Sequence, residues 1–178
     1  PMAWLVAQPS QLSQFHRNLF STNGFRECPG TTGMLLELDN PALQPLFLPK
    51  SENGSPSSFE VVRVDSKELL SVWAEILIES YQFPKGLTDA WEELHREIGF
   101  RRRAAEESSL PWEHLLVRQG DDYIGTSSLF CGGSPDNSSL ANLAVTPSHR
   151  GTGVGSLIVR QCLASLLEYG YRTVTLYA

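Results

Sequence analysis

One short segment of the chain carries residue types that suit the binding of a negatively charged ligand. Arg150 precedes Gly151, Gly153 and Gly155, and the run ends where an amphipathic segment begins. Glycines leave out side chains where a backbone must approach a ligand closely. A helix that starts here would present unpaired N–H groups with a partial positive charge, and Arg150 adds a guanidinium that can chelate phosphate oxygens. The segment therefore predicts a pyrophosphate site.

Other interpretations of this glycine-rich segment compete. A P-loop reads GxxxxGK followed by Ser or Thr, and no lysine follows these glycines. The dinucleotide fingerprint GxGxxG belongs near the first strand–helix turn of a parallel sheet, and Ser156 stands where its third glycine would be. A glycine-rich connection without any ligand remains open. The spacing of Arg150, Gly153 and Gly155 fits RxxGxG in full.

The elements that must position this segment follow from apolar periodicity. Strands are predicted at 59–64, 112–118, 123–130, 140–145 and 173–177. Helices are predicted at 67–81, from Thr88 as the N-cap to about residue 107, and at 156–169, with Gly170 just past the end. This order of elements predicts a mixed α/β (α+β) fold in which helices cover a largely antiparallel sheet.

The segment Leu143 to Gly155, LAVTPSHRGTGVG, resembles the central stretch of the GNAT N-acetyltransferases. The similarity covers 59–178 in the order of elements and is sharpest over 139–177. It implies the GNAT acyl-CoA N-acyltransferase fold and acetyl-CoA as cosubstrate. In that family the motif strand pairs with the pantetheine arm like an added strand, and the turn holds the pyrophosphate. Carried onto this sequence, the binding residues are Leu143, Ala144 and Val145 for the arm and Arg150, Gly151, Thr152, Gly153, Val154 and Gly155 for the pyrophosphate.

The reaction that the resemblance implies is attack of an amine on the thioester, with a base that takes the ammonium proton. We therefore expect an N-acetyltransferase whose acceptor is the amine of a small molecule or peptide. Tyr81 and Phe83 stand where the family places an acceptor-binding loop, so both are substrate-binding candidates, together with Asn142. Two alternatives stay open: a non-catalytic acyl-CoA-binding or regulatory module of the same fold, and a nucleotide-binding domain.

No catalytic residue is assigned from the sequence. The usual glutamate of the motif strand is absent, because Asn142 stands in that strand. The family's usual tyrosine lies on a helix beyond the last strand, and this sequence stops at Ala178, so we expect a catalytic domain without the usual C-terminal helix and strands. The candidates for a base, each also explained as a solvated helix position or a strand residue, are Glu75, Glu79, Tyr81 and His114.

The N-terminal region predicts a separate piece of structure. Residues 49–58, PKSENGSPSS, have the composition of a linker. Residues 1–48 before it read as strand, helix and strand, with Met34–Leu38 as the last strand, and resemble a degenerate GNAT half-domain. This piece is either a relic half-repeat packed on the catalytic domain of 59–178 or a segment that completes its sheet, in cis or in a homodimer. A structure with Met34–Leu38 unpaired would exclude the second hypothesis.

Composition narrows the class of protein further. The net charge of −6 argues against a nucleic-acid partner and suits a cationic amine acceptor. No apolar run approaches the roughly 20 residues that span a bilayer, and the N-terminal segment lacks the pattern of a signal peptide. We therefore expect no membrane partner and a cytoplasmic location. The 3 cysteines and 4 histidines show no metal-ligand spacing, so no metal site is expected.

Overall fold

The computed structural model describes residues 33–40, 59–100 and 111–177, together with the isolated positions 13, 14, 18 and 22. The chain divides into two units, Pro1–Thr32 and Gly33–Ala178, and all elements below belong to the second. Of the predicted N-terminal helix, positions 14, 18 and 22 are described and are helical. The predicted linker at 49–58 lies outside the described residues.

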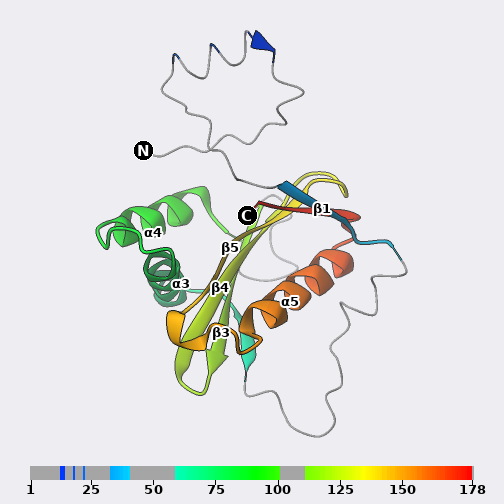
Figure 1. The fold of residues 1–178 in the computed structure, drawn as a ribbon. Coiled ribbons are helices and arrows are strands. Elements are labelled where there is room, and N and C mark those ends of the chain that lie inside the picture. Colours follow the sequence, from blue (N-terminus) through cyan, green and yellow to red (C-terminus); the bar gives the residue numbers. More distant parts are fainter. Residues whose placement is uncertain are drawn as a thin grey trace, which may run out of the picture. The chain divides into compact units, whose positions relative to one another are not determined.

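A six-stranded sheet forms the centre of this unit, with the strand order β1-β6-β5-β4-β3-β2 (Figure 1). Its strands are β1 (Gly33–Glu37), β2 (Glu60–Arg63), β3 (Trp112–Gln119), β4 (Asp122–Cys131), β5 (Ser138–Val145) and β6 (Thr173–Tyr177). Neighbouring strands run antiparallel, except that β5 and β6 are parallel. The expected mixed α/β fold with a largely antiparallel sheet is confirmed.

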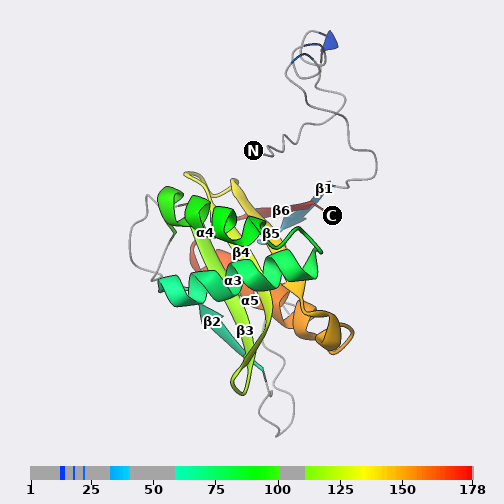
Figure 2. The ribbon, with the colours of Figure 1, turned by 90° about the vertical axis from the view of Figure 1, so that its left-hand side faces the viewer.

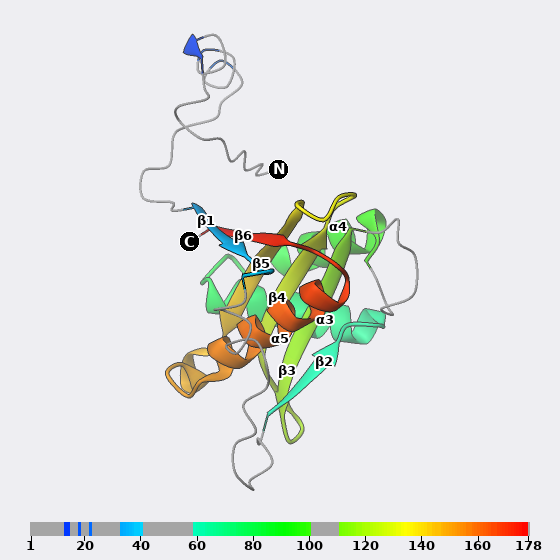
Figure 3. The ribbon, with the colours of Figure 1, turned by 90° about the vertical axis from the view of Figure 1, so that its right-hand side faces the viewer.

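Helices cover both faces of the sheet. The helices α3 (Lys67–Ser80) and α4 (Leu87–Ile98) lie over one face (Figure 2), and α5 (Val154–Glu168) lies over the other (Figure 3). Helix α3 begins where its N-cap Ser66 accepts a hydrogen bond from the Leu69 backbone N–H at 3.2 Å. Each face of the sheet therefore has its own hydrophobic layer.

The bounds of α4 differ from the sequence prediction at both ends. The helix begins at Leu87 with Gly86 as its N-cap, so the prediction that Thr88 caps it was wrong. It ends at Ile98, well before residue 107, because Gly99 follows with a φ of 74°. That left-handed conformation, which glycine adopts without strain, cannot continue a helix.

The other elements predicted after residue 58 are confirmed with small shifts of their ends, whereas the first strand predicted before residue 48 lies outside the described residues. Helix α5 begins at Val154, two residues before the predicted start, because Gly153 with a φ of 92° already serves as its N-cap. Gly170 follows the helix with a φ of 81°, as predicted. Strand β5 begins at Ser138 instead of at residue 140.

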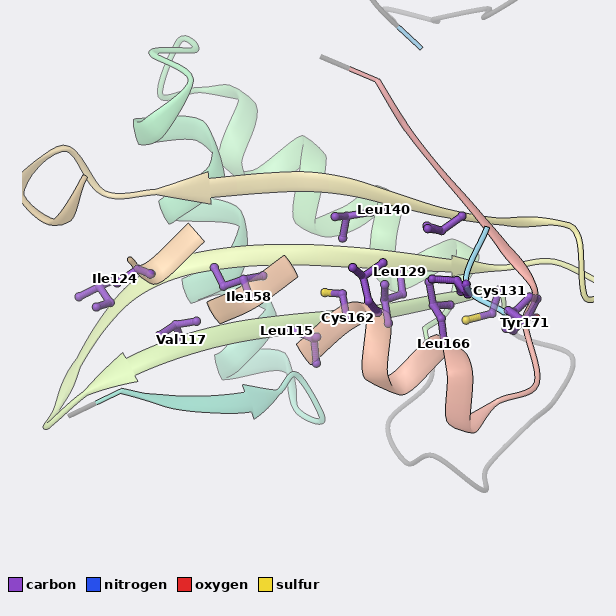
Figure 4. Packing of buried hydrophobic residues seen from close by; sticks show 14 residues of the cluster. Leu115, Val117, Ile124, Leu129, Cys131, Leu140, Ile158, Cys162, Leu166 and Tyr171 are labelled. Carbon is purple, nitrogen blue, oxygen red and sulfur yellow. The ribbon is translucent and has the colours of Figure 1, made fainter. Parts of the chain in front are cut away.

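Two hydrophobic clusters hold the layers together. Between α5 and the sheet, Ile158, Cys162 and Leu166 of the helix pack on strand residues such as Leu115 and Leu129 (Figure 4). The second cluster, between α3 and the other face, is built from fully buried or nearly buried side chains, among them Leu70, Trp73, Leu77 and Leu116. The clusters lie on opposite faces of the sheet, and the strand β5 contributes to both, with Leu140 in the first and Ala144 in the second.

Strand β1 is an edge strand of the main sheet. It pairs with β6 from Gly33↔Tyr177 to Glu37↔Thr173, which confirms the strand predicted at Met34–Leu38 to within one residue. The Leu38 backbone N–H donates to the Arg172 carbonyl at 2.7 Å, and its side chain is buried in the α5 cluster. Residues 34–37 are thus paired with a strand of the same chain. The hypothesis that this segment completes the sheet is therefore not excluded.

Gly125 of β4 lets α5 approach the sheet closely. A Cβ atom at this position would lie 2.9 Å from Ile158 Cδ1, 3.1 Å from Val154 Cγ1 and 3.3 Å from the Ala144 carbonyl oxygen. We expect Gly125→Ala to lower the free energy of unfolding by about 1–3 kcal/mol, because the helix must move away from the strand. Urea unfolding measures this change. Gly133→Ala is the matched control, since a Cβ there meets nothing within 4 Å, and an equal loss in both variants would contradict the packing argument.

Candidate functional site

The glycine-rich turn surrounds a hollow at the N-terminus of α5. The chain leaves β5 at Val145, makes a short 3₁₀ turn over Pro147–His149 and enters α5 at Val154. The hollow has a volume of about 370 Å³. Five of the predicted cosubstrate-binding residues line it: Val145, Arg150, Gly151, Gly153 and Gly155.

Two further residues line the hollow that were not among the predicted binding residues. These are His149 and Ser156, which flank the glycine motif on either side. The His149 ring Nδ1 lies 3.0 Å from Thr146 Oγ1 and 2.9 Å from Ser148 Oγ. Position next to the motif was the signal that could have identified both residues, because neighbours of a tight turn share its concave side.

The glycines serve the turn in two different ways. Gly151 and Gly153 have φ values of 78° and 92°, a left-handed region that side chains rarely adopt, and they meet open space where a Cβ would be. Gly155 has an ordinary helical backbone, and a Cβ there would be in normal contact with Val145 Cγ2 at 3.8 Å. The fold itself therefore requires glycine at 151 and 153, whereas nothing in the fold requires it at 155.

Strand β5 presents a free edge beside the hollow. The Thr146 N–H donates to the Ile124 carbonyl at 3.0 Å, and the ladder continues through Gly125↔Val145 and Thr126↔Ala144. Hydrogen-bonded pairs alternate along an antiparallel ladder. The backbone groups of Val145 therefore face away from β4, and those of Ala144 face it.

The parallel neighbour β6 does not cover that edge. It pairs with β5 only at Ser139↔Thr175 and Leu140↔Leu176, and then takes a different direction (Figure 3). Among the described residues, no strand pairs with β5 beyond Leu140 on this side. An extended ligand with amide groups has the hydrogen-bonding partners of a strand here.

Arg150 lies between the hollow and the end of α3. Its Nε donates to the Val145 carbonyl at 3.3 Å, and its Nη2 donates to the Ser80 carbonyl at 3.0 Å. A guanidinium at the C-terminal end of a helix complements the helix dipole. The Arg150 side chain is exposed and lines the hollow. Its positive charge therefore faces the space that a ligand in the hollow would occupy.

The structure brings two of the three substrate-binding candidates, Tyr81 and Phe83, together. Tyr81 is the C-cap of α3, and its hydroxyl donates to the Leu143 carbonyl at 2.9 Å. Its ring stacks on Phe83, with centroids 5.8 Å apart. Burial raises the pKa of the Tyr81 phenol above its usual value, so the hydroxyl stays protonated and donates.

Asn142 occupies a bulge in β5. Its φ of 53° is left-handed, and the register between β4 and β5 shifts at this point, between Thr126 and Ser128. The Asn142 amide Nδ2 donates to Ser128 Oγ at 3.1 Å, and Ser128 Oγ lies 2.8 Å from His114 Nδ1. A buried polar row therefore links β5, β4 and β3 behind the free edge.

The candidates for a base are placed in different surroundings. Glu75 and Glu79 are exposed on α3, while His114 is fully buried. His114 packs against Trp73, with centroids 4.3 Å apart, and against His95 of α4 at 4.6 Å. Burial, and then the neighbouring His95, lower the pKa of His114 well below its usual value.

The fold and the turn together define a class of protein: a mixed sheet with helices on both faces, and a strand–glycine turn–helix unit that surrounds a hollow. The GNAT acetyltransferase family model matches residues 70–178, more than half of the chain. The chain belongs to the GNAT acetyltransferase family. The resemblance seen in the sequence is confirmed, and so is the GNAT fold.

Solved structures of low sequence identity share this fold. A GCN5-related N-acetyltransferase from Sphaerobacter thermophilus is 15% identical with a TM-score of 0.58, over 93% of this chain and 47% of that one. A conserved protein of unknown function from Staphylococcus epidermidis is 12% identical with a TM-score of 0.54, over 94% of this chain and 57% of that one. A GCN5-related N-acetyltransferase from Kribbella flavida is 15% identical with a TM-score of 0.53, over 84% of this chain and 50% of that one. The chain thus spans about half the length of these proteins. No curated protein matches it in sequence.

The structure bears on membrane-spanning helices and on metal sites only for the residues that it describes. Within 33–40, 59–100 and 111–177, no helix has the length and apolar character to cross a bilayer. Over the same residues, histidine, cysteine and acidic side chains do not gather in groups that could hold a metal ion.

Proposed function

We propose that this protein is an N-acetyltransferase that moves an acetyl group from acetyl-CoA to the amine of a small molecule or peptide. The observation that carries the proposal is the hollow at the N-terminus of α5, with left-handed Gly151 and Gly153 on its wall and Arg150 beside it. Unpaired N–H groups of a helix start and a nearby guanidinium suit a pyrophosphate. The free edge of β5 suits the amide groups of a pantetheine arm.

The proposed reaction joins an amine to the acetyl group of the thioester and requires two proton transfers. The neutral amine attacks the thioester carbonyl, a C–N bond forms and the C–S bond breaks. The amine loses a proton to a base, and the CoA thiolate takes up a proton as it leaves. We propose that Tyr81 and Phe83, which meet at the end of α3 beside β5, form part of the acceptor side. The net charge of −6 suits a cationic amine.

Gly155 gives the cleanest test of the cosubstrate site, because the fold does not require glycine there. We expect Gly155→Glu to raise the dissociation constant of acetyl-CoA at least about tenfold, since the new carboxylate repels phosphate in the hollow. Stability should hold, because an acidic residue near a helix N-terminus is favourable. Isothermal titration and thermal melting measure both properties.

Gln161→Glu is the matched control for that variant. Gln161 is exposed on the same helix and does not line the hollow, so the same added charge should leave the affinity within about twofold of the wild type. Equal affinities in wild type and Gly155→Glu would show that the hollow is not the phosphate site.

Turnover separates the enzyme from a binding module. Release of CoA thiol across a panel of primary amines is the expected result for the proposed function. Binding of acetyl-CoA without turnover of any amine would favour the regulatory module instead. Tighter binding of NAD or ATP than of acetyl-CoA would favour the nucleotide-binding domain.

A further inference from the structure

The two carbonyl groups on the free edge of β5 are both already bonded to side chains. The Tyr81 hydroxyl donates to the Leu143 carbonyl at 2.9 Å, and Arg150 Nε donates to the Val145 carbonyl at 3.3 Å. An extended ligand that pairs with this edge has to donate its amide N–H groups to the same oxygens. The ligand and these two side chains therefore compete for the acceptors.

The competing groups are not equivalent. Arg150 lines the hollow, so its charge stays favourable to a bound phosphate after its contact with Val145 is lost. Tyr81 does not line the hollow. Among the described residues, the hydrogen bond of its hydroxyl goes to the Leu143 carbonyl. Displacement of Tyr81 therefore costs a bond that the phosphates of a ligand do not replace.

The side chains at the end of α3 leave the Tyr81 ring room to move away from β5. Tyr81 is 50% exposed and Phe83, which stacks on it, is 39% exposed, so neither ring is locked in a core. Gln82 between them has a φ of 56°, a conformation that non-glycine residues rarely adopt. The backbone N–H groups of residues 81–83 all donate to carbonyls of α3, so release of the Leu143 carbonyl needs a movement of the Tyr81 side chain alone.

Resting on the proposed function, we propose that the Tyr81 side chain occupies the place of the pantetheine arm on β5 and competes with it. Its hydroxyl caps the Leu143 carbonyl until an acyl-CoA arm takes that acceptor. The arm therefore adds less to the affinity for acyl-CoA than it would if Tyr81 did not occupy the acceptor. The contribution of the phosphates to that affinity is unchanged. Binding of the arm frees the Tyr81 ring, with Phe83, at the end of α3 where the acceptor side is proposed.

Tyr81→Phe tests this proposal because it removes only the hydroxyl and keeps the ring. We expect the variant to bind acetyl-CoA about two- to tenfold more tightly than the wild type, which is the range for the net strength of one hydrogen bond. The nucleotide half of CoA alone, 3′-phospho-ADP, lacks the arm, so its affinity should not change. Isothermal titration of both ligands with both proteins gives the comparison.

Tyr171→Phe is the matched control variant. The Tyr171 hydroxyl also donates to a backbone carbonyl, that of Gly132 at 2.6 Å, but it lies past the other end of α5. Removal of the Tyr171 hydroxyl should leave the affinities for acetyl-CoA and for 3′-phospho-ADP as in the wild type.

The outcomes distinguish this inference from the proposed function. If the wild type binds neither ligand, the proposed function fails. If the wild type binds both, and Tyr81→Phe binds acetyl-CoA equally or more weakly, the place-holding role is overturned and the proposed function stands. Tighter binding of both ligands by the same factor would also overturn it, because the effect would not depend on the arm.

Discussion

Glu113→Ala should lower the free energy of unfolding by about 2–4 kcal/mol, because Arg63, whose side chain is 25% exposed, loses its counter-charge and the Tyr169 hydroxyl loses its acceptor. The Glu113 side chain is 0% exposed, between β3 and α5. Its Oε2 lies 2.5 Å from Arg63 Nη1 and accepts a hydrogen bond from the Tyr169 hydroxyl at 2.9 Å. The Tyr169 hydroxyl in turn accepts from Arg63 Nη2 at 3.0 Å. One carboxylate therefore holds β2, β3 and the end of α5 together.

A double variant separates the loss of charge balance from the loss of packing. Arg63→Met with Glu113→Leu removes both charges and keeps similar volume, and it should be more stable than Glu113→Ala alone. Urea unfolding of the wild type and the variants gives the comparison. A loss below about 1 kcal/mol in Glu113→Ala would mean that water reaches the site and replaces the carboxylate.

Lowering the pH from about 8 to about 5 should remove about 2 kcal/mol of stability for each of two buried histidines, about 4 kcal/mol together. Burial lowers the pKa of His95 to about 4, and burial followed by the charge of His95 lowers the pKa of His114 further. In the unfolded chain both histidines bind a proton below pH 6.5 or so. The unfolded state therefore binds more protons in this window. The stability is complete above pH 6.5, and it is lost as the pH falls toward 4.

A single replacement shows how much of this slope the histidines supply. His95→Phe keeps an aromatic ring between Trp73 and Trp91 but cannot titrate, so it should remove about half of the loss between pH 8 and pH 5. The measurement is urea unfolding at a series of pH values, above the range where most carboxylates titrate. A wild-type stability that stays flat over this range would contradict the argument.

The elements and the motif could be predicted because their signals are local. Apolar spacing predicted the three helices and five strands after residue 58, and the glycine pattern predicted a turn at 151–155. Gly153 shows why the boundaries were less exact: its φ of 92° starts α5 at Val154, and no spacing rule reports a backbone angle. The error at α4 has the same cause, because Gly99 ends that helix through its conformation.

The residues that surround the motif could not be predicted, because their contacts join distant parts of the chain. Tyr81 meets Leu143 across 62 positions, and Arg150 meets Ser80 across 70. Glu113 and Tyr169, which are 56 positions apart, were not singled out at all. Nothing in the residues themselves indicates such partners, since only the packing of the folded chain brings them together.

The sequence by itself determined the chemistry of the turn: glycines with the freedom for left-handed angles, an arginine beside them, and a helix start that gathers N–H groups toward one point. These properties depend on residues within one short segment, so local rules suffice. Only the tertiary structure decided which side chains hold the neighbouring edge of β5. The end of α3 reaches that edge because α3 packs on the sheet through its own buried face, and this placement puts the Tyr81 hydroxyl on the Leu143 carbonyl.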